Sequence, residues 1–300
     1  MKKELTYEKM MEKLTALCIE HPILKLHYIG NSILGRAIPL ITIGEEDAKK
    51  SVLYVGTHHA SENITTSLLV DFIEEYAKMY EKGRDVFGIN LKVLYKMRKI
   101  YVVPMLNPDG VSYRLDGIGE QNPLKERALR ANPSGDFSKW NANARGVDLN
   151  HNYNALFYEY KQIEKELGIK EGATKYSGEE PESEPETASL CKLIRYNIDT
   201  LSGVLTLHTQ GEEIYYKSGD VSPKKGESIA KILSKMTGYT LGETSGTSSY
   251  GGLTDWLVRE YDKPSFTIEC GKGENPLDIS CESSIYTVLR RAFFNFPILF

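Results

Sequence analysis

The hydrophobic positions of this chain follow two patterns that alternate along its length. Short apolar runs bounded by turn residues occur at 38–43, 52–55, 100–105, 204–207 and 265–268. Apolar residues at helical spacing occur at 5–20, 64–80, 184–196, 228–236 and 285–294. Because the short runs are apolar without alternation, they are typical of strands buried on both faces of a sheet that helices cover. The pattern predicts an α/β fold with a mixed, mostly parallel, twisted sheet and helices on both faces.

Residues 170–187 form the most polar stretch, with the sequence KEGATKYSGEEPESEPET. A linker between two domains is one interpretation. A surface loop is the other, and we favour it because the chemically distinctive residues described below lie on both sides of this stretch and must meet. We therefore predict a single domain over residues 1–300, with an N-terminal helical extension over residues 1–24 and a core over residues 25–300.

Composition and charge narrow the class of protein. The 300 residues include 37 Lys and Arg and 41 Asp and Glu, a net charge of −4, whereas nucleic-acid binding needs clustered basic residues. No run approaches the roughly 18 apolar residues of a membrane span. The four cysteines form no C-x-x-C pair, and Glu4, Glu8 and Glu12 interrupt the apolar core that a signal peptide would need. We expect a cytoplasmic protein that binds neither nucleic acid nor membrane; nothing in the composition specifies an oligomeric state.

Several predicted strands end at residues that can bind a metal or move a proton. His59 and Glu62 follow one apolar run, His208 ends a second and Glu269 a third, and strand ends of this kind are where ligands bind in open α/β sheets. His59 and Glu62 are three residues apart and share one face of a helical turn, although such a pair is more often a surface pair. With His208 they complete the two-histidine, one-carboxylate set of catalytic zinc sites. Glu269 is then left as the candidate base for an attacking water.

Five separated motifs carry a resemblance to a known family. The motifs GTHHASE, PMLNPDG, RGVDLNHN, LTLHT and FTIE occur in this order. Together they resemble the zinc carboxypeptidase family, the metallopeptidases related to carboxypeptidase A, over residues 25–295. The resemblance implies a zinc peptidase with that family's α/β fold and a peptide substrate. It also implies one zinc ion on His59, Glu62 and His208, with Glu269 as the general base.

Two features beside these residues have structural interpretations. His58 is out of register with the metal set, because the residue three positions further on is Ser61. We expect His58 to support the site from behind. The N-P-D-G segment at 107–110 predicts a turn that shapes the wall of the site.

The resemblance also suggests which residues bind the substrate. Asn150 matches an Asn that grips the terminal carboxylate in the family's exopeptidases, with a turn residue as the alternative. The Arg that follows it in those enzymes is here His151, which lacks the bidentate fork of a guanidinium, so ordinary C-terminal carboxylate binding is not expected. Thr254 holds the position that sets side-chain preference, and Tyr250 is a substitute for the family's mobile tyrosine or a packing residue. Arg145 is a candidate to stabilise the oxyanion, with simple surface placement as the alternative.

The segment after Glu269, C-G-K-G-E-N-P-L, and the D-L-N-H-N motif resemble one branch of the family. This branch, gamma-D-glutamyl-meso-diaminopimelate peptidase I, acts on murein peptides, and the likeness implies hydrolysis of the gamma-D-glutamyl–meso-diaminopimelate bond during recycling of soluble murein peptides. A conventional metallocarboxypeptidase or deacylase of the same fold is the alternative, and His151 argues against it. A non-catalytic binding protein is a further alternative, although it would not need a base such as Glu269. Cobalt or manganese in the same site remains open beside zinc.

Overall fold

A computed structural model of the chain describes residues 3–243, 246–247 and 249–300. Among these residues, eight strands form one sheet in the order β1-β2-β6-β3-β7-β10-β8-β9. Their bounds are β1 Leu24–Asn31, β2 Ala37–Ile43, β3 Lys50–Val55, β6 Arg98–Val103, β7 Leu201–His208, β8 Glu213–Tyr215, β9 Thr240–Leu241 and β10 Ser265–Glu269. The central strands β6, β3, β7 and β10 are parallel, with antiparallel pairs towards both edges. The short strands β4 (Asp85–Val86) and β5 (Ile89–Asn90) pair separately.

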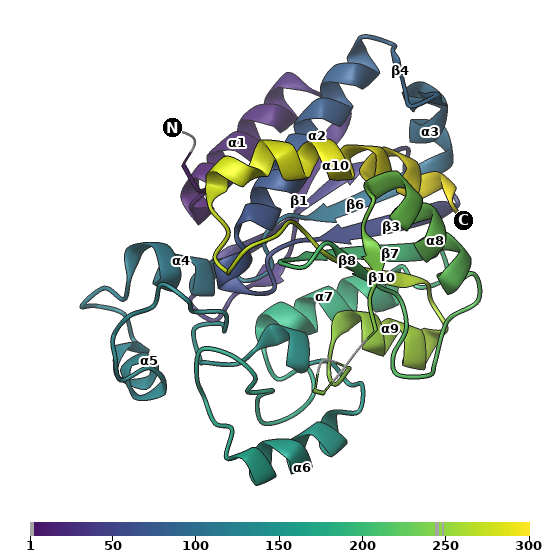
Figure 1. Ribbon diagram of the computed structural model, residues 1–300. Helices are drawn as coiled ribbons and strands as arrows, with labels where there is room; N and C mark the ends of the chain where they lie inside the picture. The colour runs from purple at the N-terminus through teal and green to yellow at the C-terminus, as the bar shows by residue number, and fades with distance from the viewer. Residues whose placement is uncertain (1–2, 244–245, 248) are drawn as a thin grey trace.

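Helices cover both faces of the large sheet (Figure 1). One face carries α1 (Tyr7–Glu20), α2 (Ile64–Glu81), α3 (Leu91–Met97), α8 (Gly226–Thr237) and α10 (Glu282–Asn295). The other face carries α7 (Pro185–Tyr196) and α9 (Leu253–Tyr261). The remaining helices are α4 (Pro108–Asp116), α5 (Lys125–Ala131) and α6 (Phe157–Leu167), with the 3-10 turns η1 (Ala60–Glu62), η2 (Leu149–His151), η3 (Ile279–Cys281) and η4 (Phe296–Ile298).

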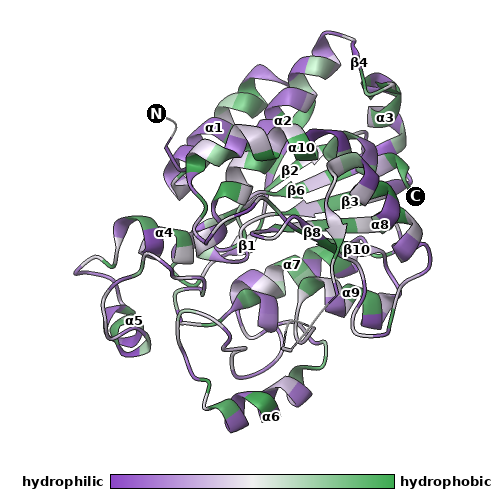
Figure 2. Ribbon diagram, viewed as in Figure 1, coloured by the Kyte–Doolittle hydropathy of each residue, from purple (hydrophilic) through white to green (hydrophobic). Residues whose placement is uncertain are grey.

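The buried apolar side chains of the described residues gather on these two faces. On β3, Val52 and Tyr54 belong to the cluster that includes α2 and α10, whereas Leu53 and Val55 belong to the cluster that includes α7 and α9. Successive side chains of a strand point to opposite faces, so a strand that is apolar at every position is covered on both sides. Along α1 and α2, hydrophobic and hydrophilic residues alternate (Figure 2), as expected of helices with one buried face. The predicted α/β fold is confirmed.

Two features differ from the pattern. The N-P-D-G segment begins α4 instead of forming a turn: Asn107 Oδ1 accepts a hydrogen bond from the backbone N–H of Gly110 at 3.0 Å, and Pro108 occupies the first helical turn. These are the residues that start helices well, because an Asn side chain satisfies an orphan N–H and Pro needs no partner there. Strand β1 has no counterpart in the apolar runs because it is an edge strand with partly exposed side chains.

The polar stretch at 170–187 is mostly a loop that ends where α7 begins at Pro185. It packs against the segment that carries the D-L-N-H-N motif: the N–H of Gly172 donates to Gly146 O at 3.1 Å, and Asn152 Nδ2 donates to Ser177 O at 2.7 Å. The loop therefore lies against one wall of the site described next. In the described part of the chain, no helix combines the length and the apolar character needed to cross a membrane.

Candidate active site

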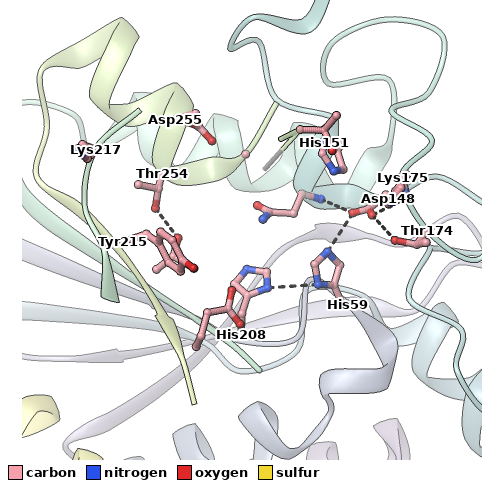
Figure 3. Close-up of a pocket in the computed structure, with 15 residues that line it drawn as sticks. His59, Asp148, His151, Thr174, Lys175, His208, Tyr215, Lys217, Thr254 and Asp255 are labelled. Carbon is pink, nitrogen blue, oxygen red and sulfur yellow. Dashed lines mark hydrogen bonds and ion pairs between the residues drawn. The ribbon is translucent and has the colours of Figure 1, made fainter. Parts of the chain in front are cut away.

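A cavity of about 330 Å³ lies at the carboxyl ends of the central strands. His208 and Glu269, the last residues of β7 and β10, line it together with His59, which follows β3. The other described lining residues are Asp148, Asn150, His151, Thr174, Lys175, Tyr215, Lys217, Thr247, Gly252, Thr254, Asp255 and Thr267. In Figure 3, His59 and His208 lie at the floor between one wall with Asp148, Thr174 and Lys175 and another with Tyr215, Thr254 and Lys217. The strand ends singled out in the sequence therefore meet.

Three side chains converge at the floor of this cavity. His59 Nδ1 lies 3.0 Å from Glu62 Oε1, and His208 Nδ1 lies 3.0 Å from Glu62 Oε2. The two Nδ1 atoms are 3.3 Å apart. Ligand atoms of all three residues lie within 4.8 Å of one another, so one metal ion could be held between them. Glu62 and His208 are almost completely buried, which keeps bulk water from competing for these atoms.

The local backbone explains how His59 and Glu62 come together. After β3 the chain enters η1, and the N–H of Glu62 donates to His59 O at 3.1 Å, which closes one tight turn. Just before it, Thr57 has a positive φ of 52°. Its hydroxyl lies 2.8 Å from those of Thr65 and Thr66 at the start of α2. The predicted helical turn is thus a 3-10 turn, and the hydroxyl contacts of Thr57 join the residues before it to the start of α2.

Asp148 orients the first of these ligands. His59 Nε2 lies 3.0 Å from Asp148 Oδ1, while Asp148 Oδ2 accepts from the Thr174 hydroxyl at 3.0 Å and the Lys175 backbone N–H at 2.8 Å. Burial raises the pKa of Asp148, but the adjacent His59 and these donors outweigh burial and hold the pKa well below its usual range. An ionised Asp148 can only accept, so His59 Nε2 carries a proton and Nδ1 faces the metal position.

Glu62 is held by a residue from a distant loop. Asn275 Nδ2 donates to Glu62 Oε1 at 3.3 Å and to Thr209 O at 2.7 Å. Burial raises the pKa of Glu62, but the flanking His59 and His208 lower it more strongly, to about 2. Glu62 is therefore a carboxylate at neutral pH, and Asn275 supplies a donor without bringing a competing charge.

Glu269 adds a third carboxyl group beside the same floor. It pairs in register with His208 on β7 and with Glu213 on β8. Burial, together with the charges of Glu62 and Glu213, raises the pKa of Glu269 well above its usual range. A raised pKa makes the Glu269 carboxylate a stronger proton acceptor than an ordinary glutamate.

The charge balance of the floor fits a zinc ion. Glu62, Asp148 and Glu269 bring three carboxyl groups together, and buried charges require partners. Burial lowers the pKa of His59, but Glu62 and Asp148 raise it more strongly, to well above its usual range, so the group favours a positive charge at this point. Two histidines and a carboxylate are donor types that zinc binds, and three protein ligands are typical of catalytic zinc.

His58 lies directly behind this group and is fully buried. Its ring stacks on that of His208 with centroids 5.3 Å apart, and its Nε2 lies 2.8 Å from the Tyr153 hydroxyl. Burial lowers the pKa of His58 well below its usual range. As expected from its register, it lies outside the metal group and supports the His208 ring.

The family model described as zinc carboxypeptidase matches residues 8–293. This chain belongs to the zinc carboxypeptidase family. It is therefore a metallopeptidase, and the zinc ion expected from the sequence is the metal of its family.

Individual relatives agree with this membership. The chain is 33% identical to gamma-D-glutamyl-L-diamino acid endopeptidase 1 of Lysinibacillus sphaericus over 93% of this chain and 69% of that protein. The fold is similar to that of thrombin activatable fibrinolysis inhibitor, with a TM-score of 0.71 at 20% identity over 98% of this chain and 73% of the other. It is also similar to murein-tripeptide amidase MpaA of Escherichia coli O157, with a TM-score of 0.55 at 21% identity over 90% of each chain.

In this zinc carboxypeptidase, the two residues expected at the substrate carboxylate have different surroundings. Asn150 lines the cavity, and its Oδ1 accepts from the backbone N–H of Leu253 at 3.2 Å. His151 also lines the cavity, but its Nδ1 lies 2.7 Å from Tyr250 O and its ring stacks on Tyr160 at 4.4 Å. Because a carbonyl can only accept, Nδ1 of His151 is a donor. Burial lowers the pKa of His151, which favours the neutral ring, so its Nε2 is an acceptor and unsuited to a carboxylate.

Thr254 and Tyr250, the other two residues expected to bind substrate, also differ in their surroundings. Thr254 lines the cavity, with its hydroxyl 2.9 Å from that of Thr267 and 3.1 Å from that of Ser265. The described lining residues include Thr247 and not Tyr250. The Tyr250 ring stacks 6.0 Å from Tyr160, which agrees with the packing alternative, and a contact of Tyr250 with bound substrate stays a prediction.

Arg145 is not among the described residues that line this cavity, so its role in stabilising an oxyanion stays a prediction. Arg145 lines a separate hollow with Arg127, Glu179 and Glu184. Its Nη1 lies 3.6 Å from Glu184 Oε2, a carboxylate that is almost completely buried. The Arg145 side chain is 39% exposed, which agrees with the surface-placement alternative.

Sequence reasoning assigned no role to several residues that the structure brings to the cavity. Asp148 stands inside the quoted RGVDLNHN motif, two residues before Asn150, and that position could have marked it. Asp255 stands inside G-G-L-T-D-W. Lys217 follows no motif, and only the fold of β8 and the loop after it places Lys217 in the cavity.

Proposed function

We propose that this protein is a zinc peptidase that hydrolyses the gamma-D-glutamyl–meso-diaminopimelate bond of murein peptides. His59, Glu62 and His208 hold the zinc ion, and Glu269 is the general base. The observation that carries the proposal is the convergence of the three ligand atoms within 4.8 Å beside the carboxyl of Glu269. The name of the Lysinibacillus relative, which refers to gamma-D-glutamyl-L-diamino acid bonds, supports the choice of substrate.

When bound at this site, zinc supplies Lewis acidity, which polarises the scissile carbonyl and makes water easier to ionise. Glu269 takes a proton from the attacking water as the water oxygen bonds to the carbonyl carbon. It then delivers that proton to the leaving amine nitrogen as the C–N bond breaks. Burial and the charge of Glu62 raise the pKa of Glu269, which makes its carboxylate a stronger acceptor for the water proton than an ordinary glutamate.

His151 does not decide between the two substrates, because the diaminopimelate of the tripeptide and a conventional C-terminal residue both present a free α-carboxylate. A neutral imidazole that accepts at Nε2 cannot form the paired donors that a guanidinium offers to a carboxylate. The presence of Asn150 in the cavity is the observation that favours the alternative, a conventional metallocarboxypeptidase. Under either substrate, the partner is a peptide.

The test is mass spectrometry of products from zinc-loaded protein and L-Ala-gamma-D-Glu-meso-diaminopimelate, with the Glu269→Gln variant as control. We expect free diaminopimelate from the parent protein only. Survival of the tripeptide, together with release of the C-terminal residue from an N-blocked dipeptide ending in Phe or Lys, would replace the murein substrate by a conventional one. The cytoplasmic location expected from the sequence stays a prediction, which fractionation of the source cells would check.

A further inference from the structure

The wall opposite Asp148 carries two side chains of opposite charge that the proposed chemistry does not use. Asp255 and Lys217 both line the cavity. In Figure 3 they lie on the same side as Thr254 and Tyr215, away from His59 and Asp148. They are therefore positioned to contact the substrate's side chain and not the bond that breaks.

Asp255 is a buried carboxylate with an unsatisfied oxygen. It is 5% exposed, and its Oδ1 has no hydrogen-bond partner among the described residues. It stands in the first turn of α9, where the N–H groups of Gly252 and of Asp255 itself bind the carboxylate. A buried polar atom without a partner is costly, and a donor from a ligand would remove that cost.

Lys217 approaches the same region from the loop after β8. Its Nζ lies 2.7 Å from Glu243 Oε2, and the Glu243 side chain is 79% exposed. An ion pair with so exposed a partner is weak, so a substrate carboxylate can take its place or share it. Lys217 therefore brings an ammonium to the cavity that remains available to an anionic group.

The two charged residues are tied to one another through Ser218. Arg259 on α9 donates from Nε to Ser218 Oγ at 2.7 Å and from Nη2 to Ser218 O at 3.1 Å. The Ser218 hydroxyl and the Arg259 guanidinium also offset part of the effect of burial, which raises the pKa of Asp255 to about 6. The residue next to Lys217 is thus fixed against the helix that carries Asp255.

The two other residues of this wall that Figure 3 labels, Thr254 and Tyr215, are uncharged. The hydroxyl of Thr254 is engaged with Ser265 and Thr267, and the Tyr215 hydroxyl donates to Glu213. Recognition on this side therefore falls to one acid and one base that line the same wall. A ligand group that carries both an ammonium and a carboxylate is the chemical complement of such a pair.

We propose that Asp255 and Lys217 form the end of the side-chain pocket and bind a side chain that itself ends in an amino acid, Asp255 taking its ammonium and Lys217 its carboxylate. This inference rests on the proposed function and deepens it: the D-centre of meso-diaminopimelate is such a group. Lysine at the same place supplies the ammonium alone and leaves Lys217 without a ligand carboxylate. The pair selects for diaminopimelate over lysine because a ligand without the distal carboxylate loses the binding energy of its contact with Lys217.

The test compares three substrates, L-Ala-gamma-D-Glu-X, in which X is meso-diaminopimelate, L-lysine or L-2-aminopimelate. The lysine lacks the distal carboxylate, and the aminopimelate lacks the distal ammonium. For Lys217→Met we expect kcat/KM to fall about 10- to 100-fold on the diaminopimelate and aminopimelate peptides and little on the lysine peptide, because a charge-assisted hydrogen bond is lost. For Asp255→Asn we expect the fall on the diaminopimelate and lysine peptides and little on the aminopimelate peptide.

A matched control keeps the test specific. Lys231 on α8 pairs with exposed Glu227 at 2.6 Å, much as Lys217 pairs with Glu243, but it lies outside the cavity. Lys231→Met should leave all three values unchanged, and Lys217→Arg should retain most of the preference for diaminopimelate. Equal losses on all three substrates for Lys217→Met and Asp255→Asn would assign both residues a structural role and overturn the inference.

A binding measurement separates this inference from the proposed reaction. Calorimetry of zinc-loaded protein with free meso-diaminopimelate and with free lysine requires no turnover. Tighter binding of meso-diaminopimelate, reduced in Lys217→Met, supports the pocket even if the tripeptide is not cleaved, in which case only the proposed function fails. Binding of meso-diaminopimelate no tighter than that of lysine would overturn the pocket, whether or not the peptide is hydrolysed.

Discussion

The two walls of the cavity differ in how completely their polar groups are engaged. On the metal wall, formed by His59, Glu62 and Asp148, His59 contacts both carboxylates, and Asn275 and the loop at 174–175 supply further donors to them. On the opposite wall, an oxygen of Asp255 has no partner among the described residues and Lys217 pairs with an exposed glutamate. The metal wall is therefore preorganised for a permanently bound ion, whereas the wall with Asp255 and Lys217 has charges available to a reversibly bound substrate.

The origin of each wall explains the difference. The metal wall is built from the ends of the central strands β3 and β7 and the tight turn η1, where packing restricts movement. The recognition wall comes from the loop after the short strand β8 and the first turn of α9. Rigid elements suit groups that must hold a metal to within tenths of an ångström. Loops and helix starts more easily change between relatives with different substrates.

The largest effect is expected from a substitution that removes the base and leaves the metal ligands unchanged. Glu269→Gln keeps the shape of the side chain but cannot accept a proton, so we expect kcat/KM to fall by about 10³-fold or more. The zinc content, measured by inductively coupled plasma mass spectrometry, should stay at one ion per chain. Loss of zinc in this variant would show that Glu269 is a ligand, and the division of roles on the floor would be wrong.

A second change tests the support behind the metal wall through pH. Glu186 is fully buried; its Oε1 accepts from the Ile33 backbone N–H at 3.2 Å, and its Oε2 accepts from Asn143 Nδ2 at 3.4 Å. Asn143 in turn binds the N–H groups of Arg145 and Val147 in the turn that precedes Asp148. Burial raises the pKa of Glu186 from 4.5 to about 8.

The sign of the pH effect follows from this shift. Between the unfolded and folded pKa values the folded protein holds the extra proton, so the contribution of Glu186 to stability is complete below the unfolded pKa and is lost as pH rises through the folded pKa. The loss is about 4 kcal/mol from about pH 5 to about pH 8, at about 1.4 kcal/mol per pKa unit. Glu186→Gln should remove this dependence, and urea unfolding at the two pH values measures it. Parallel pH profiles of parent and variant would contradict the assignment.

A smaller effect is expected where Asp148 orients His59. Asp148→Asn removes the charge that fixes the His59 ring and favours a cation, and we expect zinc affinity to fall about 10- to 100-fold. Competition with a chelator measures it. Thr174→Val is the matched control, because it removes one donor to Asp148 and leaves the carboxylate; its loss should be smaller. An Asp148→Asn variant with parent affinity would show that the ring is held by packing alone.

The smallest expected change is a gain of activity when His151, the residue after Asn150, is replaced by arginine. His151→Arg introduces the bidentate fork that a terminal carboxylate needs. We expect hydrolysis of an N-blocked C-terminal dipeptide to rise about 10-fold, a gain of about 1.4 kcal/mol. His151→Lys, which adds a charge without the fork, should gain less. If both variants gain equally, charge rather than geometry determines carboxylate binding here.

The parts of the fold that could be predicted are those with a local signal. The apolar runs marked β3, β7 and β10 because a strand buried on both faces is apolar at every position, and the spacing of His59 and Glu62 placed both on one turn. Edge strand β1 and the helix that starts in the N-P-D-G segment could not be predicted in this way. The side chains of β1 are partly exposed, so the strand has no continuous apolar run. The Asn107 cap that starts α4 is a residue that also occurs in turns.

By itself, the sequence determined the fold class, the strand ends that carry His208 and Glu269, and the metal donor set. Each of these depends on spacing within one element or on motifs read in order. Only the tertiary structure decided that Asp148 reaches His59 across 89 residues, that Arg145 lies beside Glu184 in a separate hollow and that Lys217 lies on the same wall as Asp255. Contacts between distant segments arise when the whole chain closes around its sheet, and no local periodicity records them.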